Sequence, residues 1–561
     1  MALWQNVRLN SGLADDPAWR RFVIRWSLVS LLLIGLAAYN SYGFYQFDEH
    51  YQVIELVGYK LGKTPQTELT WEFHDQIRPW LQPAIYYAEA KALIGLGVEN
   101  PFTLATAFRA ISGLIGWLAV TSLMLTANVL FGAGRGRRLA VMLLAMLWLI
   151  PYLAVRTSSE SLSSDFFTFG VAALLLGSTV RERQTATDRN RRSFSPGAAL
   201  IAGLCFGLAF EFRFQMAFAV LGVLGWVIYS AAECGRKRLG MIALICGGGA
   251  LMVLLGTCLD RWGYGRWTIV PWNYFYDDIV VGHPSRDGTA PVWWYFLIMN
   301  FNPLAPITLL WTAAMLVAWV RHPWHIATWA TLPFFVAHSL VPHKELRYLF
   351  PLTLLATFLF VVALLPGTGM RRRPAWMRAI WRRRRSWAAK SLVAFNLLGL
   401  GYVCFVAREP SLNFQHYLYD HYPHGCTMYV LGEQTRSPFE NVGATMFFYR
   451  PPNFTLQRLR DDDELAKILR RGAGDFLVVR DRLADWSPTD ASPADVRLIY
   501  RTYPEWVENC NFCNWLQNSK RFSLYAVSPL SKAAFASRLP ERATSSIAAV
   551  PSRPNDLTKL R

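Results

Sequence analysis

Apolar runs of near-membrane length, separated by short polar or basic segments, dominate the chain up to residue 407. A helix that crosses a bilayer without tilting needs about 20 consecutive apolar residues. Eleven runs reach or approach this length, and we expect each to form a membrane-spanning helix. The runs cover residues 26–42, 111–131, 139–153, 166–180, 198–210, 216–232, 241–259, 304–320, 326–341, 348–365 and 387–406.

The count depends most on the short runs at 198–210 and 216–232, which are joined across Glu211-Phe-Arg213. A re-entrant hairpin formed by this pair is the alternative, and it would leave every other segment on the same side of the membrane. We interpret Glu211 and Arg213 as a charge pair that holds the two ends together, because charges at a membrane boundary are stabilised by pairing.

Lys and Arg cluster on alternate connections between the predicted spans. Because cytoplasmic connections carry such an excess, we expect these clusters and the N-terminus to be cytoplasmic. The loop 43–100 is then extracytoplasmic, and so are the connections that carry most of the acidic residues. The dense basic clusters are 135–138, 181–192, 236–238 and 371–385.

The chain after residue 407 has the alternating pattern of a globular domain. It predicts a small extracytoplasmic α/β domain over 408–528, after the membrane domain 1–407. The segment 529–561 is rich in Ala, Ser, Pro and Arg, and we expect it to be disordered. The predicted strands are 426–431, 475–480 and 522–527, and the predicted helix is 461–471.

Composition agrees with a polytopic α-helical membrane protein, since 53% of the 561 residues are hydrophobic and the mean hydropathy is +0.20. The net charge of +19 is spread over short clusters and forms no single basic face, which argues against nucleic acid as a partner. Cys510 and Cys513 form an isolated Cys-x-x-Cys pair, whereas a structural zinc site needs four ligands. We expect no metal and no cofactor.

Three polar blocks fall on predicted extracytoplasmic connections. The first directly follows the first span and reads Tyr45-Gln-Phe-Asp-Glu-His-Tyr-Gln-Val-Ile-Glu55. A carboxylate inside hydrocarbon costs several kcal/mol, so these acids are expected to face an aqueous cavity, which is the candidate active site. The first block contains Asp48, Glu49, Gln52 and Glu55, the second contains Trp71, Glu72 and Arg78, and the third contains His343, Lys344 and Arg347.

In this order, the three blocks resemble glycosyltransferase family 22, the GT-C mannosyltransferases of GPI-anchor and dolichol-linked oligosaccharide synthesis. Gln46 and Phe47 replace the histidine and proline that open the family's first motif, whereas its histidine-lysine-glutamate-x-arginine motif is intact at 343–347. The stretch around His283 is a degraded match to another family stretch and makes this residue a donor-site candidate.

The resemblance implies a GT-C fold and an inverting transfer of a sugar, mannose in this family, from a polyprenyl phosphate to a hydroxyl of a glycan or glycolipid. Asp48 and Glu49 are then the catalytic residues. Asp48 is the general base, and Glu49 and Gln52 either orient the acceptor or hold Asp48. Positive charge for the departing phosphate comes from the third block. The implied substrate-binding residues are Gln52, Glu55, Trp71, Glu72, Arg78, His283, His343, Lys344 and Arg347.

Each block also has a simpler interpretation. Asp48 and Glu49 can cap a helix, the basic residues of 343–347 can reach lipid headgroups from an interfacial turn, and Trp71 can anchor the interface. A transporter or flippase of lipid-linked saccharides is the alternative function, but its charges lie near mid-membrane in repeated halves, and no repeat is visible. A membrane-anchored binding protein leaves the eleven spans unexplained. The expected location is a bacterial inner membrane with a periplasmic active site, or the endoplasmic reticulum in a eukaryote.

Overall fold

The computed structural model describes the chain with several gaps, and the chain divides into two compact units. The first comprises Met1–Leu412 and Asn441–Tyr449, and the second comprises Asn413–Glu440 and Arg450–Arg561. All but the first residue of the predicted tail 529–561, most of the basic cluster 181–192 and the first four residues of the basic cluster 371–385 lie outside the described residues. The described ranges are 2–180, 191–232, 235–300, 305–364, 375–432, 437–441, 443–470, 476–480, 494–510 and 521–529.

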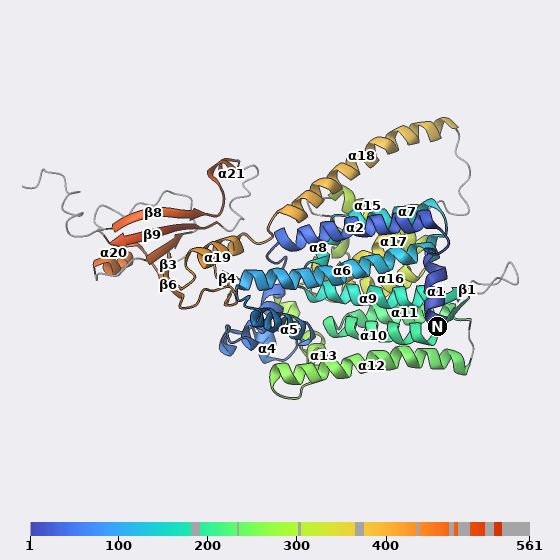
Figure 1. Cartoon of the computed structure of the whole chain (residues 1–561), viewed down its shortest axis with the longest axis horizontal. Coiled ribbons are helices and arrows are strands. Elements are labelled where there is room, and N and C mark those ends of the chain that lie inside the picture. Colours follow the sequence, from blue (N-terminus) through green and yellow to red (C-terminus); the bar gives the residue numbers. More distant parts are fainter. Residues whose placement is uncertain are drawn as a thin grey trace, which may run out of the picture. The chain divides into compact units, whose positions relative to one another are not determined.

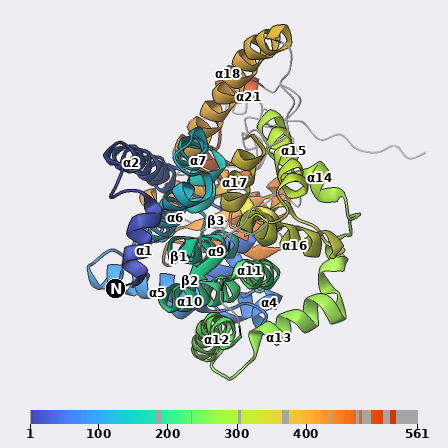
Figure 2. The same ribbon diagram turned by 90° about the vertical axis from the view of Figure 1, so that its right-hand side faces the viewer.

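Long helices that run side by side make up the body of the first unit (Figures 1 and 2). Within it, α10 packs against α9 and α12, α6 packs against α2 and α9, and α11 packs against α16. The helices are α1 (Ala2–Ser11), α2 (Pro17–Asn40), α6 (Pro101–Phe131), α7 (Arg135–Met146), α8 (Leu149–Ala154), α9 (Ser159–Leu176), α10 (Pro196–Phe212), α11 (Met216–Ser230), α12 (Arg236–Tyr264), α15 (Ala305–Arg321), α16 (Ile326–Leu340), α17 (Thr353–Leu364) and α18 (Ala375–Phe405).

Local sequence sets where several of these helices begin. The carboxylate of Asp16 accepts a hydrogen bond from the Trp19 amide at 2.9 Å, and Pro17 occupies the first position of α2. Asn100 caps α6 in the same way, with Pro101 after it. The side chain of an Asp or Asn cap accepts a hydrogen bond from a free amide of the first turn. A proline directly after the cap has no amide hydrogen, so it leaves one unpaired donor fewer.

The predicted spans fall on helices, and four helical stretches are long and apolar enough to cross a membrane. Five shorter apolar helices of 15 to 17 residues accompany them among the described residues. The pair at 198–210 and 216–232 forms two helices, α10 and α11. The long stretches are Pro17–Asn40, Pro101–Phe131, Arg236–Tyr264 and Leu346–Leu364.

Two predicted spans differ from the structure. The run 139–153 is broken, because α7 ends at Met146 and α8 begins at Leu149. Pro151 cannot continue the hydrogen bonding of α7, and the Asn396 side chain bridges the break by donating to the Met146 carbonyl at 2.7 Å and accepting from the Trp148 amide at 3.0 Å. The run 166–180 begins earlier than predicted, at Ser159, where the Ser158 hydroxyl caps α9. It also ends earlier, at Leu176, because Ser178–Val180 form the strand β1 and not the end of a helix.

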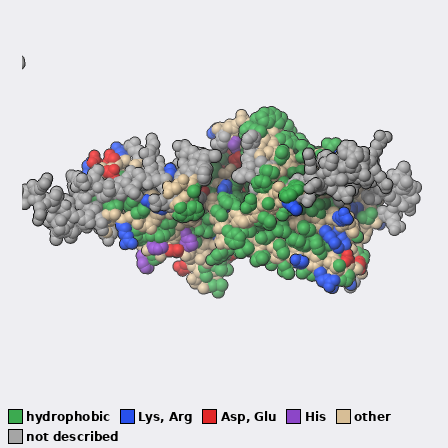
Figure 3. Space-filling model, turned by 90° about the horizontal axis from the view of Figure 1, so that it is seen from above, with side chains coloured by type: hydrophobic (Ala, Val, Ile, Leu, Met, Phe, Trp, Pro, Cys, Tyr) green, Lys and Arg blue, Asp and Glu red, His purple; other side chains and the backbone are tan. Residues whose placement is uncertain are grey.

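Hydrophobic side chains cover much of the visible face of the helical unit, and Lys and Arg gather near its right-hand end in Figure 3. Large apolar side chains on the long helices point outward, such as Leu32 on α2 and Leu254 on α12, which are 63% and 65% exposed. An apolar surface of this extent suits lipid and is unusual for a protein surrounded by water. The first unit is therefore a polytopic helical membrane domain.

Short helices occupy the end of the first unit opposite α1 and β1 (Figure 1). The carboxylate of Asp260 on α12 accepts a hydrogen bond from the Trp80 amide at 2.8 Å, which fixes the start of α5. This end carries the candidate site. The short elements are η1 (His50–Ile54), α3 (Glu55–Lys60), η2 (Gln66–Glu68), α4 (Trp71–His74), α5 (Leu81–Gly95), α13 (Val270–Phe275), η3 (Tyr276–Val281), η4 (His283–Asp287), α14 (Trp294–Ile298) and η5 (Leu346–Leu352), while β1 (Ser178–Val180) pairs with β2 (Arg192–Phe194).

The second unit contains a five-stranded mixed sheet in the order β6-β3-β7-β9-β8. Its β3 is parallel to β6 and β7, whereas β9 is antiparallel to β7 and β8. The predicted strands at 426–431, 475–480 and 522–527 match β3, β7 and β9. The two edge strands were missed because polar residues interrupt their apolar pattern. The helix α19 (Pro410–His421) begins in the first unit and continues into the second. The other elements of the second unit are β3 (Thr427–Leu431), β6 (Thr455–Leu459), α20 (Asp462–Arg470), β7 (Phe476–Arg480), β8 (Ala494–Arg501), α21 (Glu505–Asn509) and β9 (Ser523–Pro529).

Candidate active site

A cavity of about 420 Å³ opens among the short helices of the first unit. Residues of all three sequence blocks line it, although almost 300 positions separate the first block from the third. Its wall is dominated by charged and aromatic side chains. The lining includes the acids Asp48, Glu72, Asp278 and Glu345, the arginines Arg78, Arg213 and Arg347, the histidines His283 and His343, and the aromatic residues Trp71, Tyr274 and Tyr348.

Asp48 lies in this wall, two residues before the π-helical turn η1. Its Oδ2 accepts a hydrogen bond from the guanidinium of Arg347, which also donates through Nε to Glu345 Oε2 at 2.5 Å. Burial of Asp48 opposes its ionisation, but the nearby Arg347 and Arg78 outweigh burial and hold the pKa of the carboxyl below its usual value. Asp48 is therefore an ionised carboxylate that faces the cavity.

Arg213 is a second guanidinium of the cavity, and its partner differs from the predicted one. The predicted Glu211–Arg213 pair is wrong, since Arg213 pairs with Glu160 of α9 at 3.0 Å. The chain leaves α10 in an extended conformation at Arg213, whereas Glu211 still belongs to the helix and lies against Gly256 of α12. Glu160 also lies 3.9 Å from Arg347, so one buried carboxylate holds two guanidiniums.

Glu72, Arg78 and Gln52 form a connected set at another part of the wall. Arg78 donates to Glu72 Oε1 at 2.7 Å, and Gln52 Nε2 donates to the same oxygen at 2.8 Å. Burial raises the pKa of Glu72 against the opposing charge of Arg78, and Glu72 and Asp48 in turn raise the pKa of Arg78 despite its burial. Gln52 lies outside the cavity lining and acts as a support for Glu72.

Glu49 is buried behind the cavity and does not line it. Its Oε1 accepts from the amide of Tyr45 at 2.8 Å and lies 3.5 Å from the amide of Gln46. Burial raises the pKa of Glu49 to about 7, although Arg156 opposes this shift. Of the two roles that the resemblance implied for Glu49, this position favours holding the turn that presents Asp48.

Glu55 and Lys344 also lie outside the lining, in contrast to the substrate contacts implied for them. Lys344 Nζ donates to the carbonyls of Val341 at 2.5 Å and Ala290 at 2.8 Å. Lys344 therefore ties the end of α16 to a neighbouring loop and presents no free charge to a phosphate. Glu55 is turned toward His50 and Thr64.

The two histidines reach the cavity from different loops. His343 donates through Nδ1 to the Gly288 carbonyl at 2.9 Å, and its Nε2 lies 3.2 Å from Glu345. The ring of His283 packs against Trp71 with centroids 4.6 Å apart. Trp71 is 45% exposed, so it presents an aromatic face beside the charged groups. Such a face suits the apolar side of a sugar ring.

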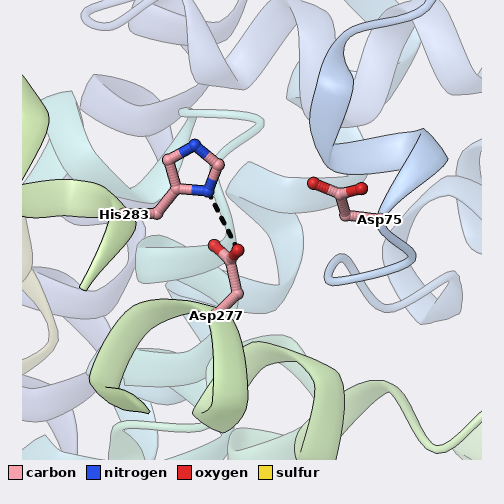
Figure 4. A group of neighbouring side chains, drawn as sticks. All are labelled: Asp75, Asp277 and His283. Carbon is pink, nitrogen blue, oxygen red and sulfur yellow. Dashed lines mark hydrogen bonds and ion pairs between the residues drawn. The ribbon is translucent and has the colours of Figure 1, made fainter. Parts of the chain in front are cut away.

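Asp75, Asp277 and His283 bring three possible metal-ligand atoms within 4.8 Å of one another (Figure 4). The Nδ1 of His283 lies 2.9 Å from Asp277 Oδ1, and Nε2 accepts a hydrogen bond from Arg286 at 2.9 Å. Nδ1 therefore carries the proton, and the positive charge of Arg286 opposes a cation. The arrangement fits a histidine oriented by a carboxylate better than it fits a metal centre.

Several lining residues were not among the predicted catalytic or substrate-binding residues. Asp278 and Arg213 stand on connections that were predicted to be extracytoplasmic, and Glu345 lies inside the third block, so their position in the chain was a usable signal. Asn441 and Ala444 also line the cavity. They are uncharged and lie within the range predicted for the C-terminal domain, so no pattern in the sequence indicated them.

Together, the helical bundle and the charged cavity at one end define a polytopic membrane protein of the GT-C class. The fold is similar to the crystal structure of ArnT from Cupriavidus metallidurans in the apo state, with a TM-score of 0.50 and 14% identity over 91% of this chain and 98% of that one. The model of the Alg9-like mannosyltransferase family matches residues 26–453. The chain belongs to this family.

Two relatives illustrate the match. Mannosyltransferase APTG1 of Arabidopsis thaliana is 22% identical over 346 residues, which cover 59% of this chain and 55% of the plant protein. GPI mannosyltransferase 3 of Emericella nidulans is 25% identical over 341 residues, which cover 58% of this chain and 43% of the fungal protein. The chain thus spans about half the length of these curated relatives.

Proposed function

We propose that this protein is an inverting mannosyltransferase. It transfers mannose from a polyprenyl-phosphate donor to a hydroxyl of a glycan or glycolipid acceptor. The observation that carries the proposal is the direct contact of Asp48 with Arg347 in the wall of the cavity. This contact joins the first and third blocks, which supply a base and a cation. Membership of a mannosyltransferase family supports mannose as the donor sugar.

The reaction needs a base for the attacking hydroxyl and positive charge for the departing phosphate. In our proposal, the acceptor oxygen attacks the anomeric carbon of mannose while the bond from that carbon to the phosphate oxygen breaks. The acceptor proton passes to Asp48, which its arginine neighbours keep ionised. The phosphate leaves as a stable anion, so no catalytic acid is required.

Arg347, Arg213 and Arg78 are the guanidiniums proposed to receive the phosphate, since all three line the cavity. A planar guanidinium can bind two phosphate oxygens at once. Glu345 orients the side chain of Arg347, and Glu160 orients the side chain of Arg213. This assignment replaces Lys344, whose ammonium is already occupied by backbone carbonyls.

The remaining lining residues are proposed to position the sugars. Trp71, held against His283, offers an aromatic face for a sugar ring, and Glu72 holds Arg78 in place. The cavity is proposed to open on the extracytoplasmic face, because the basic connections predict a cytoplasmic location for the opposite end. The bacterial inner membrane with a periplasmic site is the location that we propose.

The test uses the purified full chain in nanodiscs, radiolabelled polyprenyl-phosphate mannose as donor, and octyl α-mannoside together with a membrane lipid extract as acceptors. We expect label to enter an acceptor while polyprenyl phosphate is released in equal amount. Donor that stays intact with both acceptors, together with movement of the lipid-linked sugar across liposomes, would overturn the proposal in favour of a flippase.

A further inference from the structure

A short segment from late in the chain forms part of the cavity wall. We call Asn441–Tyr449 the strap. It belongs to the first unit, whereas the residues on both sides of it, 413–440 and 450–561, belong to the second. Asn441 and Ala444 of the strap line the same cavity as Asp48. The strap is therefore continuous with the second unit along the backbone, and two of its residues line the cavity of the proposed reacting groups.

Tyr51 holds the first half of the strap. Its hydroxyl donates a hydrogen bond to the Ala444 carbonyl at 2.7 Å, and it also lies 3.2 Å from the Asn441 carbonyl. Tyr51 stands three residues after Asp48, on the π-helical turn η1. The proposed base and the support of the strap are thus on one short stretch of chain, so the position of the strap depends on the same turn as the position of Asp48.

Glu55 holds the second half of the strap. Its Oε1 accepts from the amides of Phe447 at 2.7 Å and Phe448 at 3.1 Å, and lies 2.6 Å from His50 Nε2. Its Oε2 accepts from the Thr64 hydroxyl at 2.5 Å. A carboxylate that is only 2% exposed is costly unless it is fully hydrogen-bonded. Four donors meet this requirement, and two of them come from the strap.

Aromatic rings fix the end of the strap. Tyr449 stacks on His50, with ring centroids 5.6 Å apart, and on Phe102 of α6, with centroids 4.7 Å apart. Phe448 is fully buried and packs near Phe108 of α6. The second half of the strap is therefore anchored in the helical unit, while its first half faces the cavity.

We propose that the strap is the acceptor-side wall of the active site, and that Glu55 is a positioning residue that acts through the strap. This inference rests on the proposed function. Residues 441–449 carry no charge, so the strap brings no cation to a phosphate. The amide of Asn441 and the small side chain of Ala444 suit a neutral acceptor rich in hydroxyls.

Kinetics on the full chain in nanodiscs test the specificity role, with octyl α-mannoside as the acceptor probe. Asn441→Ala and Ala444→Leu should each raise the acceptor KM about tenfold and change the donor KM less than twofold. Tyr51→Phe, which removes one hydroxyl, should act in the same direction, and Tyr39→Phe on the exposed face of α2 is its matched control. A change in donor KM with the acceptor KM unchanged would overturn the proposal.

Hydrogen exchange tests the Glu55 clamp without any need for activity. In the full chain, Glu55→Ala should speed exchange of the amides of Phe447 and Phe448 at least tenfold, and Glu55→Gln, which keeps one acceptor oxygen, should have a smaller effect. Glu68→Ala, at an exposed site in the same loop, is the control. Unchanged exchange in Glu55→Ala would refute the clamp. Faster exchange in Glu55→Ala, together with no mannose transfer by the wild-type chain, would support the clamp and refute the proposed function.

Discussion

The guanidinium of Arg347 donates a hydrogen bond to the carboxylate of Asp48, although 299 positions separate the two residues. The contact forms because η5 and the turn before η1 meet in the wall of one cavity. It gives the two residues opposite roles in the proposed reaction. Asp48 is kept ionised to receive a proton, and Arg347 is held close to the site where a phosphate departs.

Asp48→Asn should lower the transfer rate about 10² fold or more, which is the usual effect of removing a general base. Asparagine keeps the shape of the side chain but cannot take the proton. Donor binding should persist, because the arginines remain. Single-turnover rates and binding of labelled donor measure the two effects separately. A variant with near wild-type turnover would exclude Asp48 as the base.

Arg347→Lys should fail to restore function, although it keeps the positive charge. A lysine cannot contact Asp48, Glu345 and a phosphate with one planar group. Loss of a charge-assisted hydrogen bond corresponds to about 1.5–3 kcal/mol, so donor use should fall on the order of tenfold to a hundredfold. Initial rates against donor concentration give this value. If Arg347→Lys and Arg347→Ala both show the wild-type dependence of rate on donor concentration, Arg347 does not contact the donor phosphate.

Lys344→Ala should lower thermal stability and leave the donor KM within about twofold of the wild type. Its ammonium donates to the Val341 carbonyl at the end of α16 and to the Ala290 carbonyl of a neighbouring loop, and losing charged hydrogen bonds of this kind costs about 1.5–3 kcal/mol. A thermal-shift measurement in detergent, paired with donor kinetics, separates the two effects. A large rise in donor KM with unchanged thermal stability would show instead that Lys344 contributes to binding the donor phosphate.

Glu49→Gln should make the chain more stable above pH 7 and flatten its stability profile. The pKa of Glu49 is raised from 4.5 to about 7 in the folded state. Between these values the folded chain holds a proton that the unfolded chain releases, so the free energy of unfolding falls as pH rises through this window and levels off above it. The gain above pH 7 is on the order of 3 kcal/mol. Thermal unfolding at pH 5 and pH 8 measures it, with Glu68→Gln as the exposed control. Parallel profiles for wild type and variant would contradict the burial argument.

The proposed topology predicts that single cysteines at Lys63 and Ser285 react with an impermeant thiol reagent in intact spheroplasts, whereas one at Arg135 reacts only after lysis. All three positions are exposed, and the background for the experiment replaces the eight native cysteines. Labelling of the Arg135 site from outside would reverse the orientation and move the cavity to the cytoplasmic face.

The sequence by itself determined the helices, the candidate residues and the family resemblance. Apolar runs mark membrane helices because the length and hydrophobicity of a run are local properties of the segment, and the basic clusters predict which end of the bundle is cytoplasmic. The family's motif positions brought Asp48, Glu72 and Arg347 into consideration before any geometry was known. All three line the cavity.

Only the tertiary structure decided which charges face each other. Arg213 pairs with Glu160 of α9 and not with Glu211, its neighbour in the sequence. The reason is that α10 ends at Phe212 and the backbone is extended at Arg213. Lys344 and Glu55 belong to charged sequence blocks, yet each is hydrogen-bonded to backbone groups of a segment remote in the chain. Side-chain direction depends on packing between elements that are remote in the chain, and no local pattern carries that information.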